Sequence, residues 1–159
     1  MILPAWGEEV ALKHIWMLAA LVLTGCGASE RDAPSEMGAI SPVLGIVREH
    51  MEAFNRHDVE AMAARVAPDF VWFGVAGEEV TVEARGRAAL ADGMRSYFAA
   101  LPSVRSEIEE SVVSGSFVAI RERATWTDAS GAQRTQASLG IYEIRDGLIQ
   151  RVWYYPAEG

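Results

Sequence analysis

Cysteine and lysine are almost absent from this 159-residue chain, in which Cys26 is the only cysteine and Lys13 the only lysine. A single cysteine excludes a disulfide bond within the chain and a zinc site built on several cysteines. Positive charge is scarce as well: the formal net charge is −8, and the part from Cys26 onward carries −7 once Glu8, Glu9 and Lys13 are left out. This acidity argues against nucleic acid as a partner and against a polybasic grip on anionic lipid.

Long apolar runs are also missing, because the longest one covers only the nine residues from Ile15 to Leu23. As a helix this run would span about 14 Å, roughly half of a bilayer core. Such a length is typical of the apolar part of an export signal. The run ends in Leu23-Thr24-Gly25-Cys26, which resembles the lipobox of bacterial lipoproteins. The resemblance implies a signal peptide over residues 1–25 and a diacylglyceryl group on Cys26, the new N-terminus after cleavage.

The segment before this run is acidic, whereas the first region of an export signal is normally positive. A true translation start near Val10 is the simplest interpretation. Residues 27–40 contain few large apolar side chains and are expected to form a flexible tether. The lipoprotein resemblance then implies a cell-envelope protein held to a membrane through the lipid on Cys26. In a Gram-negative source, the absence of Asp after Cys26 favours the periplasmic face of the outer membrane.

Residues 41–159 are expected to form one domain with helices first and strands in its second half. Ser41-Pro42 marks a helix start, and helical spacing of apolar residues continues to about Arg56. Asp58 is expected to cap a short helix through Val66, and a third helix is expected from Arg87 to Leu101. Gly74 to Gly77 is interpreted as a turn. Strands are predicted over Phe70–Val75, Val104–Val113, Phe117–Thr127, Thr135–Arg145 and Leu148–Tyr155.

This order of elements predicts an α+β fold, because the helices must cover one face of a sheet built largely from sequential hairpins. The expected architecture is a strongly curved antiparallel sheet with three helices on one side. Such curvature would give a cone-shaped space between the sheet and the helices.

Two stretches of this domain resemble a known superfamily. Phe54-Asn55-Arg56-His57-Asp58, followed by Ala67-Pro68-Asp69-Phe70, resembles the opening of nuclear transport factor 2-like domains. The ending from Tyr142 to Tyr155 resembles their closing hairpin. Within the superfamily the SnoaL-like group is the nearest match, over residues 41–156. The resemblance implies the cone-shaped, cystatin-like roll, and it implies no single function because unrelated activities share this fold.

The superfamily includes ketosteroid isomerase, polyketide cyclases and epoxide hydrolases, and the isomerase needs a general base and donors to an oxyanion. By the resemblance, the isomerase's helix-one tyrosine falls near His50, its base near Gly74 and its buried acid near Gly140. Glycine has no side chain to move a proton. The sequence therefore argues against that chemistry with that set of residues.

His50 and Glu122 form the one acid–base pair that the sequence offers for a test. His50 borders the apolar face of the first helix and titrates near neutral pH, whereas Glu122 has the strand parity of Ile120 and is expected to face the cone. The alternatives are a histidine hydrogen-bonded at the edge of the core and a carboxylate at the open end of a strand. His57 is expected in a loop ahead of the Asp58 cap. No metal site and no cofactor are predicted, because the domain has only two histidines and lacks phosphate-binding and dinucleotide motifs.

Aromatic residues supply the remaining candidates. The resemblance assigns to the cone the parity of five of them, namely Phe70, Trp72, Trp126, Tyr142 and Tyr154. Several large rings around a cavity suit a flat apolar ligand, but ordinary core packing explains them equally well. Trp153 and Tyr155 are expected on the other face of the sheet, where two exposed aromatic residues favour a homodimer.

Three functions remain open at this point. The first is a membrane-anchored lipoprotein domain that binds a small apolar molecule in its cone. The second is a cofactor-independent isomerase, cyclase or hydrolase that uses His50 and Glu122. The third is a protein-interaction module whose cone is filled by side chains. The first is favoured slightly, because the isomerase's acid and base are replaced by Gly140 and Gly74.

Overall fold

The computed structural model describes residues 41–158 of the chain. The predicted signal peptide, the lipid on Cys26 and the tether over residues 27–40 therefore lie outside the described residues. Within residues 41–158, no helix has the length and the apolar character needed to cross a membrane.

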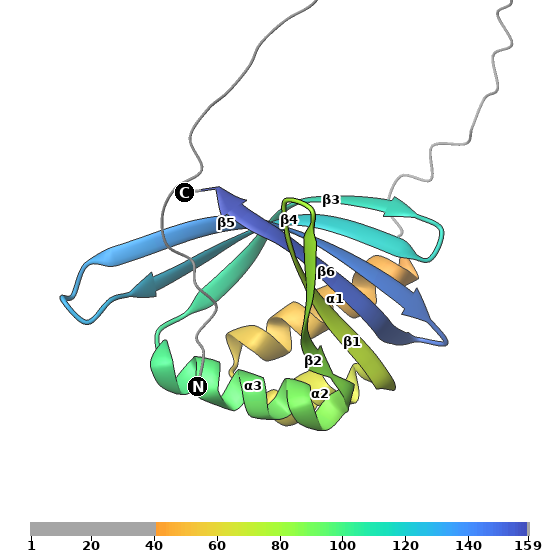
Figure 1. Ribbon diagram of the computed structural model, residues 1–159, viewed down its shortest axis with the longest axis horizontal. Helices are drawn as coiled ribbons and strands as arrows, with labels where there is room; N and C mark the ends of the chain where they lie inside the picture. The colour runs from red at the N-terminus through yellow and green to blue at the C-terminus, as the bar shows by residue number, and fades with distance from the viewer. Residues whose placement is uncertain (1–40, 159) are drawn as a thin grey trace, which may run out of the picture. The chain divides into compact units, whose positions relative to one another are not determined.

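In this part of the chain, three helices accompany one six-stranded sheet (Figure 1). The helices are α1 (Pro42–Asn55), α2 (Val59–Ala64) and α3 (Gly86–Ala100). The strands are β1 (Val66–Ala76), β2 (Glu79–Arg85), β3 (Arg105–Ser114), β4 (Phe117–Thr127), β5 (Gln133–Arg145) and β6 (Leu148–Glu158). They follow the order β2-β1-β6-β5-β4-β3 across the sheet.

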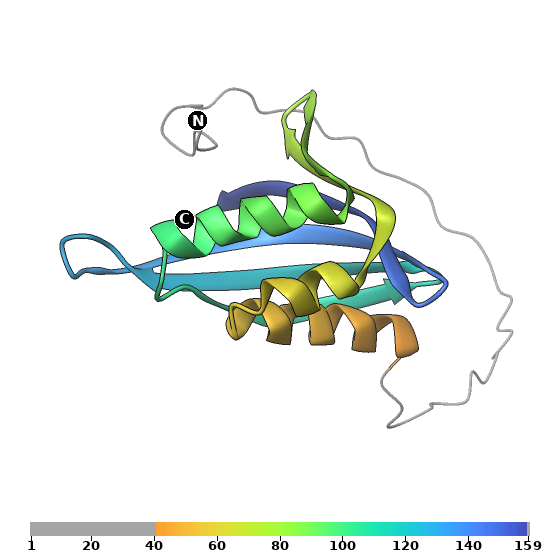
Figure 2. The same ribbon diagram turned by 90° about the horizontal axis from the view of Figure 1, so that it is seen from below.

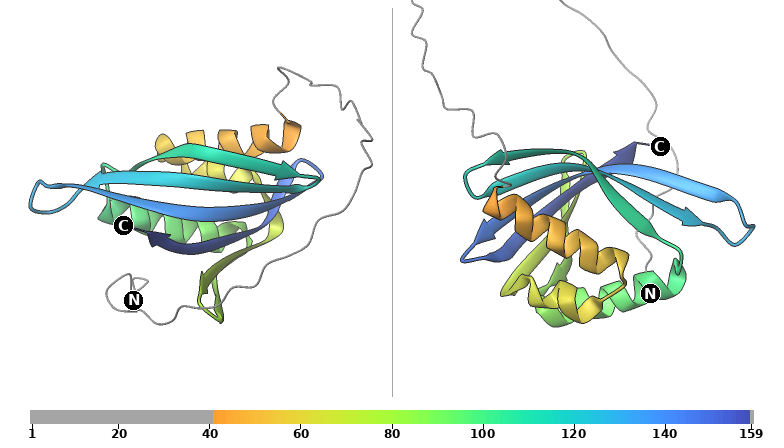
Figure 3. Two further views of the ribbon diagram at one scale, coloured as in Figure 1. Left: turned by 90° about the horizontal axis from the view of Figure 1, so that it is seen from above. Right: turned by 180° about the vertical axis from the view of Figure 1, so that it is seen from behind.

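The predicted α+β architecture is confirmed, and Figures 2 and 3 show the helices on one face of a curved sheet. The pairings between strands are antiparallel except for that of β1 with β6, which is parallel. This parallel pair arises because the β1–β2 hairpin joins the sheet beside its last strand, and α3 then connects it to the first strand of the meander, β3. The sheet is therefore mixed rather than wholly antiparallel.

Strand β2 is the element that the sequence analysis missed. The signal is present in the sequence, because Val80, Val82 and Ala84 alternate with polar residues as in a strand. In the structure Val80 and Val82 are 57% and 50% exposed. The expected turn over Gly74 to Gly77 begins too early: β1 continues to Ala76, and the chain reverses at Gly77, whose φ of +61° suits glycine.

The helices bury one apolar side each against the same face of the sheet. Helix α1 buries Leu44, Val47 and Met51. Helix α3 buries Leu90, Ala91, Met94 and Phe98. These side chains join sheet residues in one core, which includes Val118, Ile120, Ile149 and Val152. We call this sheet face the concave face and the opposite one the convex face.

The end of α1 is tied directly to the start of β3. Asn55 Nδ2 donates to the Ser106 backbone oxygen and Ser106 N donates to Asn55 Oδ1, each at 2.7 Å. His57 follows in a loop conformation with φ of +54°, and its ring stacks on Phe98 at a centroid distance of 4.1 Å. Asp58 caps α2, as predicted, by accepting from Ala61 N at 3.0 Å. These contacts hold Ser106 in place on the concave face, within hydrogen-bond distance of Glu122.

Candidate functional site

Glu122 lies in the middle of β4 on the concave face. It stands opposite Ile108 of β3 and opposite Ser138 of β5. Strand alternation places its side chain on the same face as the buried residues Val118 and Ile120. Sequence parity therefore located this carboxyl on the side of the helices.

The Glu122 carboxyl is held by hydroxyl groups. Ser106 Oγ donates to Glu122 Oε2 at 3.2 Å. Burial raises the pKa of Glu122 to about 7, and hydrogen bonds from Tyr154 and Ser106 limit that rise in pKa. The residue nevertheless keeps some solvent exposure. Near neutral pH this side chain is thus present both as an acid and as a carboxylate, which is the condition for efficient proton transfer.

Two tyrosine hydroxyls extend this group. The Tyr142 and Tyr154 hydroxyl oxygens are 2.7 Å apart. Burial raises the pKa of both tyrosines, and the nearby charge of Glu122 raises each pKa further. Both hydroxyls therefore remain protonated at neutral pH and act as donors. The order that satisfies them is Tyr142 donating to Tyr154, and Tyr154 donating to the Glu122 carboxylate.

Gly74 and Gly140 flank Tyr154 on the two neighbouring strands. A Cβ atom at Gly140 would lie 3.1 Å from Tyr142 Cε2 and 3.3 Å from Tyr154 Cζ. At Gly74 it would lie 2.6 Å from Glu83 Oε1. Gly140, which the resemblance matched to the isomerase's buried acid, thus leaves room for two tyrosine rings. Gly74, which it matched to the base, leaves room for the Glu83 carboxyl group of β2.

The five aromatic candidates fall into two groups. Trp72, Trp126 and Tyr154 are partly exposed and pack at the margin of the core, and the Trp72 and Tyr154 ring centroids are 5.7 Å apart. Phe70 and Tyr142 are only 2% and 3% exposed and belong to the core itself. Three of the five rings are therefore partly exposed, whereas Phe70 and Tyr142 are packed in the core.

His50 of α1 is the other candidate for proton transfer. Burial lowers its pKa to about 4, opposed by a hydrogen bond with the backbone of Met62 in α2. Its Nδ1 atom is buried, and within residues 41–158 it has no hydrogen-bond partner. Within residues 41–158 the hydrogen bonds of Glu122 come from Tyr154 and Ser106 and none joins it to His50, so the His50–Glu122 pair stays a prediction.

Three further residues at this site escaped sequence reasoning. Ser106 carries no signal beyond its strand parity with Ile108, and its role depends on the Asn55 bonds described above. Tyr97 counted only as part of the apolar stripe of α3, although its pKa is raised by burial and by the Glu122 charge. Glu83 lies on strand β2, which was not predicted, and its Oε1 atom accepts a hydrogen bond from Thr81 Oγ1 at 2.6 Å.

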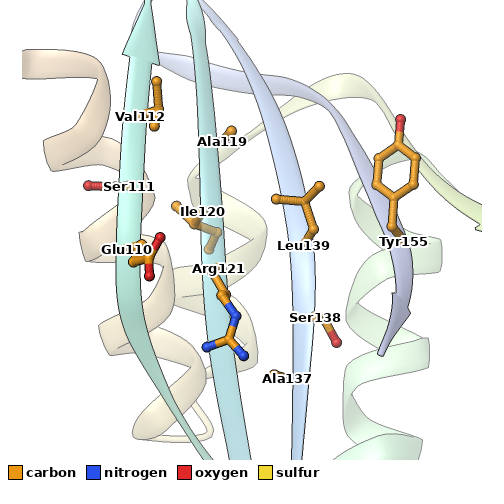
Figure 4. A pocket seen from close by; sticks show the side chains of 10 residues that line it. All are labelled: Glu110, Ser111, Val112, Ala119, Ile120, Arg121, Ala137, Ser138, Leu139 and Tyr155. Carbon is orange, nitrogen blue, oxygen red and sulfur yellow. The ribbon is translucent and has the colours of Figure 1, made fainter. Parts of the chain in front are cut away.

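Two cavities lie elsewhere on the domain. A groove of about 390 Å³ crosses the convex face between Glu110, Arg121, Leu139 and Tyr155, with the helices behind the sheet (Figure 4). A second cavity of about 430 Å³ lies between α2 and α3. Neither of these two is lined by Trp72 or Trp126, the residues beside which the cone was expected to open. In the described part of the chain, no group of three metal-ligating side chains gathers.

The convex face carries an apolar row that crosses all six strands in register. Its members are Val82, Phe73, Trp153, Ile141, Ala119 and Val112. The Phe73 and Trp153 rings stack at 5.5 Å with an interplanar angle of 12°. Val112 at one end is 68% exposed and Val82 at the other is 50% exposed. We call these residues the convex apolar row.

Comparison with known proteins agrees with this architecture. The family model described as "SnoaL-like domain" matches residues 47–152. TerC co-crystallised with polyporic acid is 19% identical, with 72% of this chain and 90% of that one covered and a TM-score of 0.61. An NTF2-like protein of unknown function from Burkholderia pseudomallei K96243 is 21% identical, with coverages of 72% and 90% and a TM-score of 0.63. A loop-truncation variant of IdmH is 25% identical, with coverages of 72% and 91% and a TM-score of 0.62.

A search among curated proteins gives no match. The solved structures therefore establish the fold, and the chemistry must be argued from the residues of this chain.

Proposed function

Because this chain belongs to the SnoaL-like domain family, we propose that its concave face binds a small, largely apolar molecule and that Glu122 exchanges a proton with it. The observation that carries the proposal is the Glu122 carboxyl, whose pKa is raised to about 7 beside the Ser106 and Tyr154 hydroxyls. Burying a carboxyl group that has no basic partner opposes folding. Buried carboxyl groups with raised pKa values therefore often mark functional sites.

The surrounding hydroxyls suit a proton transfer in either direction. When Glu122 accepts a proton from a ligand, the Tyr154 hydroxyl stabilises the preceding carboxylate, and Tyr142 at 2.7 Å polarises Tyr154. When Glu122 donates its proton, the same hydrogen bonds stabilise the carboxylate that forms. Trp72 and Tyr154 supply the apolar surface on which a ring or chain of the ligand packs. This proposal gives His50 no part, because burial lowers its pKa to about 4 and keeps the ring neutral at pH 7.

The test is native extraction of the mature protein followed by mass spectrometry of released small molecules, combined with titration of the identified molecule into variants. We expect Glu122→Gln to abolish proton exchange with the bound molecule and to change its affinity. Glu110→Gln, a matched change on the convex face, is expected to leave both unchanged. A molecule that binds both variants and the natural chain identically would contradict the proposal.

We also propose that the mature domain is held in the cell envelope by a lipid on Cys26, at the periplasmic face of the outer membrane if the source is Gram-negative. The motif Leu23-Thr24-Gly25-Cys26 and the apolar run before it support this proposal. Labelling cells with a fatty acid that carries a clickable group is expected to mark the natural chain. The same chain with Cys26→Ala is expected to stay unmarked and unprocessed; label on that variant would contradict the lipid anchor.

Finally, we propose that the domain forms a homodimer through the convex apolar row. An apolar row with exposed valines at both ends fits a self-complementary interface, and Arg121 forms an ion pair with Glu109 beside it. Analytical ultracentrifugation is expected to show a dimer for the natural chain and a monomer for Val112→Lys combined with Val82→Lys, the two exposed valines of the row. A monomer at every concentration of the natural chain would contradict this interface.

A further inference from the structure

The carboxylates of the domain differ in their partners. The buried Glu143 pairs with Arg145 and Arg151. Glu109 pairs with Arg121 and Arg123, and Asp128 pairs with Arg134. Among residues 41–155, by contrast, no basic side chain pairs with Glu122, whose bonds come from two hydroxyl groups. Glu122 is thus a negative group set into the concave face without a counter-ion from its own domain.

Tyr154 bonds this carboxyl, and two further aromatic residues lie near Tyr154 or within reach of the carboxyl's charge. The ring of Trp72 lies 5.7 Å from that of Tyr154, and Tyr154 hydrogen-bonds Glu122. Tyr97 of α3 approaches from the side of the helices, close enough for the Glu122 charge to act on it. All three rings are partly exposed. Aromatic faces attract cations through their quadrupoles, and desolvation of the site strengthens that attraction.

We propose that the ligand of this face carries a cationic nitrogen, an amine or ammonium group, that sits between the Glu122 carboxylate and the rings of Trp72, Tyr97 and Tyr154. The inference rests on the proposed function and names its ligand class. An amine that enters neutral takes the proton of the Glu122 carboxyl: the O–H bond breaks, an N–H bond forms, and a carboxylate–ammonium pair results. An amine that enters protonated pairs with the carboxylate directly.

The rest of the concave face sets the shape of such a ligand. Trp126 follows Glu122 by four residues on the same face of β4, which places it about 13 Å away at the rise of a strand. Ala124 lies between them, and the residues beside them on the neighbouring strands are Ser106, Ile108, Gln136 and Ser138. A ligand with a cationic head at Glu122 and an apolar body directed toward Trp126 would cover this surface.

Charge disfavours an anionic ligand at the same place. Glu83 adds a second carboxyl beside Gly74, next to Tyr154, and the part of the chain from Cys26 onward has a net charge of −7. Arg134 stands opposite Trp126 at the far end of the face, where it is paired with Asp128. An anion would therefore meet two carboxyl groups at the aromatic rings and an arginine that already has a partner.

The test compares two probes of equal shape that differ in charge: phenyltrimethylammonium and tert-butylbenzene, each titrated into the full chain by calorimetry at pH 8. At this pH Glu122 is ionised, whereas the facing tyrosines Tyr97, Tyr142 and Tyr154 keep their protons. We expect the cation to bind about tenfold more tightly than its neutral isostere. Glu122→Gln is expected to bring the ratio close to one, and Glu110→Gln on the convex face is expected to preserve it.

Each other outcome has its own meaning. Equal binding of both probes, weakened for both by Trp72→Leu, would overturn the cationic ligand but leave the concave face as a binding site. If the Glu122→Gln variant still prefers the cation, the preference comes from the general acidity of the domain, and the inference is overturned. Absence of binding by either probe, together with no effect of Glu122→Gln on any ligand extracted with the protein, would overturn the proposed function too.

Discussion

Two glutamates on opposite faces of one sheet, Glu122 and Glu143, show how partners decide what a buried carboxyl does. Glu143 lies on β5, where its side chain is 3% exposed, and Arg151 donates to its Oε2 at 2.8 Å while Arg145 pairs with its other oxygen. The hydrogen bond from Arg151 lowers the pKa of Glu143 against the opposing effect of burial. Glu122 has hydroxyl partners only, and burial raises its pKa to about 7.

The comparison separates a structural carboxylate from a reactive one. A carboxylate neutralised by two arginines is locked in its charged state and holds strands β5 and β6 together. A carboxyl with hydroxyl partners alone is poised between two protonation states and remains available to a ligand. The same residue type thus serves packing on the convex face and, in the proposed function, proton exchange on the concave face.

The largest effect is expected from Glu122→Gln, measured by denaturant unfolding from pH 4 to pH 8. Folded Glu122 keeps its proton up to about pH 7, whereas the unfolded chain loses it near 4.5. The free energy of unfolding of the natural chain therefore falls as the pH rises through this window and levels off above it. We expect the variant to lack this decline and to be about 2–3 kcal/mol more stable than the natural chain at pH 8. Parallel curves for the two proteins would contradict the raised pKa.

A somewhat smaller effect of opposite sign is expected from Glu143→Gln. Removing this charge leaves Arg145 and Arg151 without their carboxylate, and both arginines retain solvent contact. We expect a loss of about 2 kcal/mol at pH 7. Because the pKa of Glu143 is lowered, its contribution is present above the pKa of the unfolded chain and disappears as the pH falls below it. A loss of the same size at pH 3 and pH 7 would show that packing, not charge, is responsible.

Gly140→Ala tests how the tyrosine hydroxyls affect the pKa of Glu122, because it displaces the tyrosine rings and leaves the carboxyl group unchanged. The added Cβ atom would press on the rings of Tyr142 and Tyr154. We expect a loss of about 1 kcal/mol in thermal unfolding, together with a further rise in the pKa of Glu122 as the Tyr154 bond weakens. Gly93→Ala, where a Cβ atom meets nothing within 4 Å, is the matched control. An unchanged Glu122 titration in Gly140→Ala would separate Tyr154 from the site.

The smallest effect is expected from His50→Leu. Its buried Nδ1 atom has no hydrogen-bond partner in residues 41–158, so an apolar side chain of similar size costs little there. We expect a change in stability within about 1 kcal/mol and no change in the pKa of Glu122 or in ligand binding. A shift in the Glu122 titration would restore the pair that the sequence suggested.

The sequence predictions are correct where local patterns determine the structure, and they fail where contacts between residues far apart in the sequence determine it. Helices α1 and α3 and strand β4 are encoded by local apolar spacing, and β4 has the predicted bounds Phe117–Thr127. Strand β2 was missed although Val80, Val82 and Ala84 alternate with polar residues, and with it the position of Glu83 was missed. This alternation is short, and the place of β2 in the sheet depends on its pairing with β1, which no local pattern contains.

The site was predictable only in part for a related reason. Strand parity placed Glu122 on the concave face, since alternation is a property of β4 alone. The partners of Glu122 come from β3 and β6, and they depend on a register that no local pattern contains. Helix spacing likewise gave the face of α1 on which His50 lies, but not that this ring would meet Met62 of α2.

The most direct test of this account is a site-resolved titration of the glutamate carboxyl carbons by nuclear magnetic resonance, with Glu122 and Glu143 assigned through their glutamine variants. We expect a midpoint near pH 7 for Glu122 and one below 4.5 for Glu143. A midpoint near 4.5 for Glu122 would mean that the concave face holds an ordinary carboxylate, and the proposed proton exchange would lose its basis.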